Sequence, residues 1–290
     1  MPTISPAISP TISPAISALT SPLTSPRSRL PRLALRALVL APVVALLAVA
    51  TPASADSVDR KEPAADLPHA TRSPVWLRSE SATRPPALVY QATEGEGPRP
   101  LVMFLHGMCD APENECPQLA GAASRDRTIV CPRADLACTG GGTIWNGRPE
   151  VRTSLVNGFL ERAETAFPGR VDPSARTLVG FSLGSFVALD VAQRQKGTWK
   201  NLILIGAKIE PDARKLKEAG IESVLLGAGD RDMMKWHMVK VAESLNKKGI
   251  RATFQPMGDV GHWFAPDMDA WLTRGFAWLE RRDERLAMAR

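Results

Sequence analysis

The sequence predicts an α/β protein: a doubly wound, mostly parallel sheet with helices on both faces, in a single domain. Three observations lead to this prediction. From residue 87 onward, short aliphatic or β-branched runs alternate with longer amphipathic stretches. Several of the short runs are apolar without alternation, which is typical of strands buried on both faces of a parallel sheet. The stretches between them are long enough for helices that carry the chain from one parallel strand to the next.

Each element follows from its own pattern. Aliphatic and β-branched runs are predicted strands: 87–92, 101–107, 128–132, 176–182, 201–207, 223–229 and 252–257. Amphipathic stretches are predicted helices: 113–125, 150–166, 184–196, 211–219, 233–248 and 267–285. In the last helix, one apolar stripe is formed by Trp271, Phe276, Trp278, Leu272 and Leu279. Such sheets bind ligands beyond the carboxyl ends of their strands, so functional residues are expected there.

The positive charge of the chain is concentrated at its N-terminal end. The 290 residues contain 36 Lys and Arg against 30 Asp and Glu, a net charge of +6. Residues 1–55 hold four of the arginines and no acid, which leaves 32 basic and 30 acidic residues elsewhere. The remainder is therefore close to neutral at +2, and we expect no nucleic-acid partner.

Residues 27–55 have the three parts of a secretory signal peptide. Four arginines form the basic region, residues 37–50 form a 14-residue apolar core, and residues 53–55 (Ala-Ser-Ala) supply a cleavage site. A membrane anchor is the alternative, but it needs roughly 18–20 apolar residues, and Pro42 interrupts this shorter run. We therefore expect an exported protein, secreted or periplasmic, that starts at Asp56 and keeps no stable membrane anchor.

The other N-terminal segments show no pattern of a folded domain. Residues 1–26 repeat Ile-Ser-Pro and then Thr-Ser-Pro, a composition that cannot build a core and predicts a disordered extension. They are either a long n-region or a stretch that precedes the true start of translation. Residues 56–74 are polar and contain proline, so they are predicted to be a linker. One folded domain, which would carry any catalysis, is predicted over residues 75–290.

The predicted strand 176–182 leads into residues 180–184 (Gly-Phe-Ser-Leu-Gly), centred on Ser182, and a helix follows at once. This is the G-x-S-x-G pattern in a strand–turn–helix context, where a nucleophilic serine is held at the tip of a sharp turn. Glycines leave room for the neighbouring strand and helix, and the N–H of the next residue is free to bind an oxyanion. The motif alone is weak, so its weight depends on signals at other strand ends.

Two further strand ends carry acids and a histidine. Strand 223–229 is followed by Asp230 and Asp232, and the next strand is followed by a Gly-His turn at His262. Asp230 and Asp232 are both candidates for the acid that orients the base. His262 is the expected general base. His237, on a predicted helix, is its rival.

The chain order of serine, acid and histidine resembles that of the α/β-hydrolase superfamily. From Leu101 to the C-terminal helix, the chain is similar to the dienelactone hydrolases and small carboxylesterases of that superfamily. The predicted strand 101–107 ends in His106-Gly107, and Met108 follows. This segment resembles the superfamily's oxyanion loop. The resemblance implies that the backbone N–H groups of Met108 and Leu183 bind the oxyanion. It also implies that His106 holds the loop and is not the base. The superfamily's pattern strand–Gly–x–x–Asp implies Asp232 as the acid, with Asp230 as the alternative.

These features predict a serine hydrolase that cleaves a carboxylic ester through an acyl-enzyme. Ser182 would attack the carbonyl, His262 would take its proton, and Asp232 would orient the imidazole. No cofactor or metal is expected, and the expected partner is a small-molecule ester substrate. An amidase or peptidase with the same triad is the nearest alternative, and a non-catalytic binding protein of this fold is another. The motifs predict neither the oligomeric state nor the natural substrate.

All four cysteines fall between residues 109 and 138: Cys109, Cys116, Cys131 and Cys138. In an exported chain, an even number of cysteines predicts disulfides. A zinc site is the competing interpretation, but two Cys-x6-Cys spacings do not match the usual short spacers of zinc ligands. Of the three possible pairings we favour the local one, Cys109–Cys116 and Cys131–Cys138, which closes a small loop at each of two strand ends.

Three aromatic residues are candidates for the wall of a substrate pocket: Phe181, Trp145 and Trp263. The first is adjacent to the predicted nucleophile, and the last follows the predicted base. Trp145 follows three glycines, residues 140–142. We interpret these glycines as a rim loop and not as a phosphate-binding loop, because no Gly-Lys-Ser/Thr follows at a helix start. An ordinary core position is the alternative for each of the three.

Overall fold

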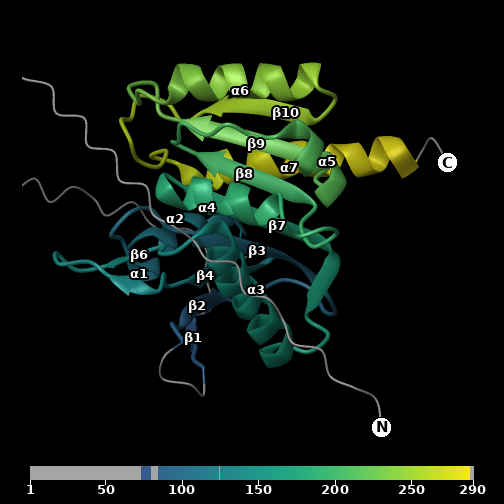
Figure 1. Ribbon diagram of the computed structural model, residues 1–290. Helices are drawn as coiled ribbons and strands as arrows, with labels where there is room; N and C mark the ends of the chain where they lie inside the picture. The colour runs from purple at the N-terminus through teal and green to yellow at the C-terminus, as the bar shows by residue number, and fades with distance from the viewer. Residues whose placement is uncertain (1–72, 80–83, 124, 288–290) are drawn as a thin grey trace, which may run out of the picture. The chain divides into compact units, whose positions relative to one another are not determined.

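A central sheet organises the protein (Figure 1). Its eight strands are β1 (Val75–Leu77), β2 (Ala87–Tyr90), β3 (Arg99–Leu105), β4 (Thr128–Pro132), β7 (Val171–Phe181), β8 (Asn201–Ile205), β9 (Ser223–Ala228) and β10 (Arg251–Pro256). Their order across the sheet is β1-β2-β4-β3-β7-β8-β9-β10. The β1–β2 and β2–β4 pairs are antiparallel, and all other neighbours are parallel. The predicted mostly parallel sheet is confirmed.

The computed structural model describes residues 73–79, 84–123 and 125–287. The predicted Ser/Pro-rich extension and signal peptide, with nearly all of the predicted linker, lie outside the described residues. Within the described part of the chain, no helix is both long enough and apolar enough to cross a membrane.

Helices cover both faces of the sheet, as Figure 1 shows. They are α1 (Pro112–Glu115), α2 (Pro117–Ala123), α3 (Pro149–Ala166), α4 (Leu183–Ala192), α5 (Ala213–Ala219), α6 (Lys235–Lys247) and α7 (Met268–Ala287). One core cluster joins α3, α4, α5 and α6 to the sheet and includes Phe159, Val187 and Met238. A second cluster joins α2 and α7 to the opposite face and includes Leu119 and Trp271. The doubly wound arrangement therefore has two cores, one on each face.

The central strand β3 explains why the apolar runs of the sequence do not alternate with polar residues. Residues 101–105 are all fully buried. Leu101 and Met103 belong to the core cluster on one face, whereas Val102 and Phe104 belong to the cluster on the other. Successive side chains of a strand point to opposite faces, so a strand with two covered faces must be apolar throughout. Burial of each such side chain stabilises the fold by roughly 1.5–3 kcal/mol.

Some elements differ from the prediction. The predicted helix 113–125 is two short helices, α1 and α2, because Pro117 has no N–H to continue the hydrogen-bond ladder and instead begins α2. The structure adds β1 and a small hairpin of β5 (Leu136–Ala137) and β6 (Thr143–Ile144). These strands are too short for a periodic pattern. The predicted apolar stripe of α7 is confirmed, with Trp271 and Leu272 fully buried.

Candidate active site

Ser182 lies in the sharp turn between β7 and α4, with a backbone φ of 50° and ψ of −117°. This conformation is strained for a residue with a side chain. A Cβ at Gly180 would lie 2.3 Å from the Gly184 oxygen, and a Cβ at Gly184 would lie 1.9 Å from the Leu105 oxygen. Both positions exclude a side chain because β7, α4 and β3 approach so closely. The Ser182 N–H donates to the Ile205 oxygen at 2.8 Å, which ties the turn to β8.

A chain of hydrogen bonds runs from Ser182 through His262 to Asp232. His262 Nε2 lies 2.9 Å from Ser182 Oγ, and His262 Nδ1 lies 2.8 Å from Asp232 Oδ2. Asp232 is buried, and its Oδ1 accepts the Met234 N–H at 2.8 Å. Because Nδ1 donates to this carboxylate, Nε2 is left to accept the serine proton. The His262 side chain is 47% exposed, so the serine end of this chain is open to a ligand from solvent.

His106 holds the loop that follows β3. It is fully buried, its Nε2 accepts the Ala134 N–H at 3.1 Å, and its Nδ1 lies 2.8 Å from the Gly107 oxygen. These partners assign the ring proton to Nδ1, which donates to Gly107. Burial lowers the pKa of His106, which favours the neutral ring. The Gly107 carbonyl and the Met108 N–H share one planar peptide group, so this hydrogen bond also sets the direction of the Met108 N–H.

Two backbone N–H groups, one after the His-Gly pair and one after Ser182, are candidates to bind an oxyanion. Within the described residues, the N–H groups of Met108 and Leu183 have no hydrogen-bond acceptor. Leu183 is the first residue of α4, and the first N–H groups of a helix have no partner inside it. Both donors are therefore available to a bound anion or to a developing negative charge.

Solved structures with the same architecture include S-formylglutathione hydrolase from Agrobacterium tumefaciens. That match has 16% identity and a TM-score of 0.54, and it covers 74% of this chain and 97% of the other. Fluorophosphonate-binding serine hydrolase F from Staphylococcus aureus matches at 14% identity and a TM-score of 0.53, over 71% of this chain and 97% of the other. A carboxylesterase from Bacillus cereus matches at 16% identity and a TM-score of 0.51, over 67% and 93%.

These matches to solved structures identify the architecture. The protein has the α/β-hydrolase fold. No family model matches the chain, and no curated protein sequence does so either.

In this α/β-hydrolase fold the two alternative site residues lie elsewhere. Asp230 forms an ion pair with Lys235 at 2.9 Å, whereas Asp232 contacts His262. His237 lies on α6, and its Nε2 is 2.6 Å from a backbone oxygen of the segment after β8. The structure thus brings Asp232 and His262 to the serine and gives Asp230 and His237 other partners.

Gly206, just after β8, lies beside the same side chains and was not singled out by the sequence pattern. It has a φ of 61°, and a Cβ there would lie 3.0 Å from His262 Cε1 and 3.2 Å from Asp232 Oδ2. The available signal was a glycine at the end of an apolar strand, a common feature of strand ends. Glu115, buried beneath the loop after β3, is a second residue that the pattern did not single out.

The cysteines form two disulfides, Cys109–Cys138 and Cys116–Cys131. The local pairing favoured from the sequence is therefore wrong. Cys131 lies in β4, which packs in the same core cluster as Cys116, and the β5–β6 hairpin returns the chain to the loop after β3, where it bonds to Asp110. Tertiary neighbours thus decide the pairs. Among the described residues, no group of three or more His, Cys, Asp or Glu side chains could hold a metal ion.

The three aromatic candidates for a pocket wall have different surroundings. Phe181 is buried, and its ring centroid lies 5.2 Å from that of His262. Trp263 is 46% exposed and meets Phe181 in a T-shaped contact at 6.0 Å. Trp145 is buried beneath the loop after β3, and its Nε1 donates to the His106 oxygen at 3.0 Å. Of the three, Trp263 is the side chain that a ligand beside His262 can reach.

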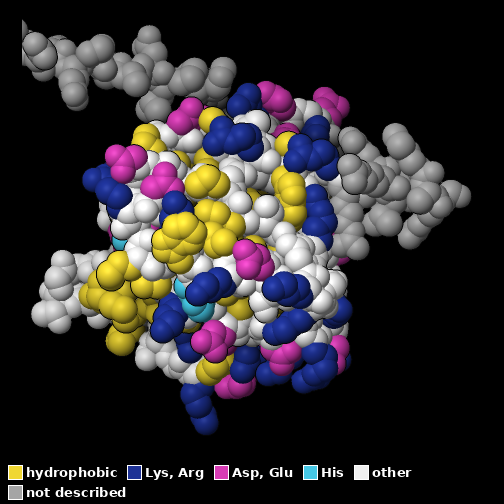
Figure 2. Space-filling model, turned by 90° about the horizontal axis from the view of Figure 1, so that it is seen from above, with side chains coloured by type: hydrophobic (Ala, Val, Ile, Leu, Met, Phe, Trp, Pro, Cys, Tyr) yellow, Lys and Arg dark blue, Asp and Glu magenta, His cyan; other side chains and the backbone are white. Residues whose placement is uncertain are grey.

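Three residues that directly follow candidate site residues in the sequence have exposed, large apolar side chains. Met108 follows the His-Gly pair, Met233 follows Asp232, and Trp263 follows His262. Met233 is the most exposed of them at 87%. Figure 2 shows that hydrophobic side chains also gather among lysines and arginines on the face seen from above.

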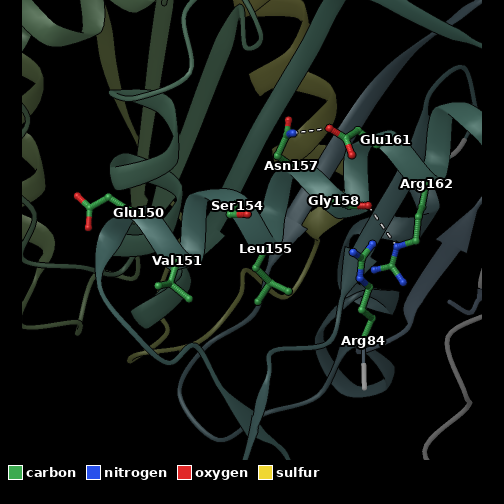
Figure 3. Close-up of a pocket in the computed structure, with 9 residues that line it drawn as sticks. All are labelled: Arg84, Glu150, Val151, Ser154, Leu155, Asn157, Gly158, Glu161 and Arg162. Carbon is green, nitrogen blue, oxygen red and sulfur yellow. Dashed lines mark hydrogen bonds between the residues drawn. The ribbon is translucent and has the colours of Figure 1, made fainter. Parts of the chain in front are cut away.

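A separate cleft lies along α3, with a volume of about 630 Å³ (Figure 3). The side chains of Arg84 and Arg162 lie side by side in it. Its lining residues are Arg84, Glu150, Val151, Ser154, Leu155, Asn157, Gly158, Glu161 and Arg162. Ser182 and His262 are not among them, so this cleft is not the site described above.

Proposed function

We propose that the protein is a serine hydrolase that cleaves carboxylic esters through an acyl-enzyme. The observation that carries the proposal is the hydrogen-bonded chain Ser182–His262–Asp232, with distances of 2.9 and 2.8 Å. These residues follow the carboxyl ends of β7, β10 and β9, where sheets of this kind bind ligands. The solved esterases with the same fold support the choice of an ester bond.

In the first half of the reaction, Ser182 Oγ attacks the ester carbonyl while His262 Nε2 takes its proton. Asp232 accepts the Nδ1–H throughout, which holds the reactive tautomer and stabilises the imidazolium. The carbonyl oxygen becomes an oxyanion, bound by the N–H groups of Met108 and Leu183. The ester C–O bond then breaks, and the imidazolium returns its proton to the departing alcohol.

In the second half, a water molecule replaces the alcohol. His262 removes a proton from this water as it attacks the acyl-enzyme carbonyl, and the same two N–H groups bind the second oxyanion. When the bond to Ser182 breaks, the proton passes from the imidazolium to the serine oxygen. The products are the acid and the restored enzyme, so no cofactor takes part in the balance.

The substrate side of the proposal is a small ester with an apolar acyl or alcohol group. Met108, Met233 and Trp263 support it: their side chains are exposed, Met108 supplies one oxyanion N–H, and the other two directly follow the proposed acid and base. An amide substrate requires the same triad, so the bond type needs a direct comparison. The rates of hydrolysis of p-nitrophenyl acetate and of its amide analogue p-nitroacetanilide give this comparison. We expect release of p-nitrophenol, and faster cleavage of the anilide would favour an amidase.

Covalent labelling tests the nucleophile. A fluorophosphonate probe should modify Ser182 in the folded protein, and peptide mass spectrometry should locate the label there. Ser182→Ala should remove both the label and p-nitrophenyl acetate hydrolysis. A folded protein without a label on Ser182 would contradict the proposal and favour a non-catalytic binding protein.

We further propose that the protein is exported. Residues 27–55 would be the signal peptide, after the Ser/Pro-rich residues 1–26, and residues 56–74 would link the cleavage site to the domain at 75–290. The two disulfides support this, since disulfides persist in oxidising compartments. N-terminal sequencing of protein recovered outside the cytoplasm should give Asp56, and retention of the arginine-rich segment would contradict the assignment.

A further inference from the structure

Glu115, the last residue of α1, is buried beneath the loop after β3 with only 1% of its surface exposed. The Gly107 N–H donates to its carboxyl group, with distances of 3.0 Å to Oε2 and 3.3 Å to Oε1. A second hydrogen bond joins the carboxyl groups of Glu115 and Asp110. None of the ion pairs of the described residues includes Glu115. A buried carboxyl group without a cation is costly unless hydrogen bonds hold it.

We propose that Glu115 is a positioning residue of the oxyanion hole: its buried carboxyl group holds the Gly107 N–H and, together with His106, sets the direction of the Met108 N–H. The inference rests on the proposed ester hydrolysis. Gly107 is bound on both sides, because His106 donates to its oxygen and Glu115 accepts from its nitrogen. The Met108 N–H shares its planar peptide group with the Gly107 carbonyl, which His106 holds. Glu115 anchors the peptide group before it, so both bonds together restrict the two backbone rotations at Gly107 that could turn the Met108 N–H.

The bond between the two carboxyl groups requires one proton, since an ionised carboxylate only accepts hydrogen bonds. Burial, followed by the hydrogen bond with Asp110, raises the pKa of Glu115 to about 9. The pKa of Asp110 is lowered: burial opposes the shift, but hydrogen bonds from Asn114, the Ala111 N–H and Glu115 outweigh it. The shared proton therefore belongs to Glu115 at neutral pH.

This arrangement gives the loop a sensitivity to alkaline pH. When Glu115 loses its proton near pH 9, two carboxylates face each other in the interior, where like charges repel strongly. The other titratable groups around them do not cancel this repulsion. His106 is neutral because it is buried, and Arg133 already pairs with Glu113. Repulsion between Glu115 and Asp110 then displaces the carboxyl that holds the loop.

Three variants separate positioning from a general structural role. In Glu115→Gln, the amide oxygen accepts the Gly107 N–H and the amide N–H donates to Asp110, so the variant mimics the protonated acid at every pH. Glu115→Leu removes both bonds at similar size. Glu243→Gln is the matched control, because Glu243 is an exposed glutamate on α6 and not on the loop after β3.

We expect kcat for p-nitrophenyl acetate to fall about 10–100-fold in Glu115→Leu with little change in KM, because an oxyanion contact forms only in the transition state. In Glu115→Gln, most of the activity at pH 7 should be restored. The decline of kcat above pH 9 in the wild type should be absent from that variant. Glu243→Gln should follow the wild type throughout.

Urea unfolding tests whether the folded protein keeps Glu115 protonated, and it does not depend on ester hydrolysis. The unfolded chain releases the Glu115 proton at its ordinary pKa, whereas the folded protein keeps it, so the wild type loses stability from about pH 5 to pH 9. The urea midpoint of Glu115→Gln should therefore rise relative to the wild type over this range.

A constant difference between the two midpoints would overturn the inference, and so would a kcat within twofold of wild type in Glu115→Leu. A wild type that hydrolyses no ester would contradict the proposed function, and the urea comparison would still decide the state of Glu115.

Discussion

Gly206 and His262 lie so close together that any side chain at position 206 would press on the imidazole. A Cβ built on Gly206 would lie 3.0 Å from His262 Cε1 and 3.2 Å from Nδ1. The same atom would lie 3.2 Å from Asp232 Oδ2. The space in which the histidine and the aspartate meet is therefore left by a glycine that directly follows a third strand, β8.

Gly206→Ala should lower both activity and stability. The new Cβ displaces the His262 ring, so we expect kcat for p-nitrophenyl acetate to fall at least about 10-fold. A φ of 61° costs an alanine roughly 1 kcal/mol of unfolding free energy. Gly197→Ala is the matched control, because Gly197 has a φ of 71° but open space around its Cα. It should lose similar stability in urea unfolding and keep its kcat, and equal losses of kcat in both variants would contradict this account.

The two candidate acids should differ sharply in their effect on catalysis. Asp232→Asn leaves the His262 ring without its carboxylate, and we expect kcat to fall about 10³–10⁴-fold. Asp230→Asn removes only a partly exposed ion pair with Lys235, which contributes at most about 1 kcal/mol to stability. Steady-state kinetics on p-nitrophenyl acetate measure both variants. A larger loss in Asp230→Asn would reverse the assignment.

The disulfide pairing predicts which thiol each cysteine substitution sets free. In Cys109→Ser the free thiol should be Cys138, and in Cys116→Ser it should be Cys131. Alkylation followed by peptide mass spectrometry identifies it. Replacing both Cys116 and Cys131 by alanine should lower the unfolding free energy by about 3 kcal/mol, given a sequence separation of 15. Alkylation of Cys116 in the Cys109→Ser variant would instead indicate the local pairing.

Acid should destabilise the fold through His106. Burial lowers its pKa below the ordinary value of 6.5. As the pH falls below about 6.5, the unfolded chain takes up a proton that the buried ring does not, so the free energy of unfolding decreases. Glu115 acts in the opposite direction over this range, because its raised pKa adds stability as the pH falls. Urea unfolding at pH 7.5 and pH 5.5 therefore measures the decrease in the Glu115→Gln variant, and adding His106→Gln to that variant should make it smaller. The same decrease in both proteins would show that other groups cause it.

Much of the fold and part of the candidate site could be predicted because their signals are local. The apolar run of β3 and the Gly-x-Ser-x-Gly turn around Ser182 each act within a few residues of chain. The break between α1 and α2 at Pro117 was also local, but an apolar pattern that continued through it concealed the break. The short β5–β6 hairpin had no periodic pattern to detect, since each of its strands has two residues.

The sequence by itself therefore determined the α/β architecture, the position of Ser182 at a strand end, and a candidate base in His262. Only the tertiary structure decided that Cys109 pairs with Cys138, that Gly206 must leave room for the imidazole, and that Glu115 lies buried under the loop after β3. The physical reason is one of range. Periodicity and turn geometry arise between residues a few positions apart, whereas these contacts arise where whole strands and helices pack together.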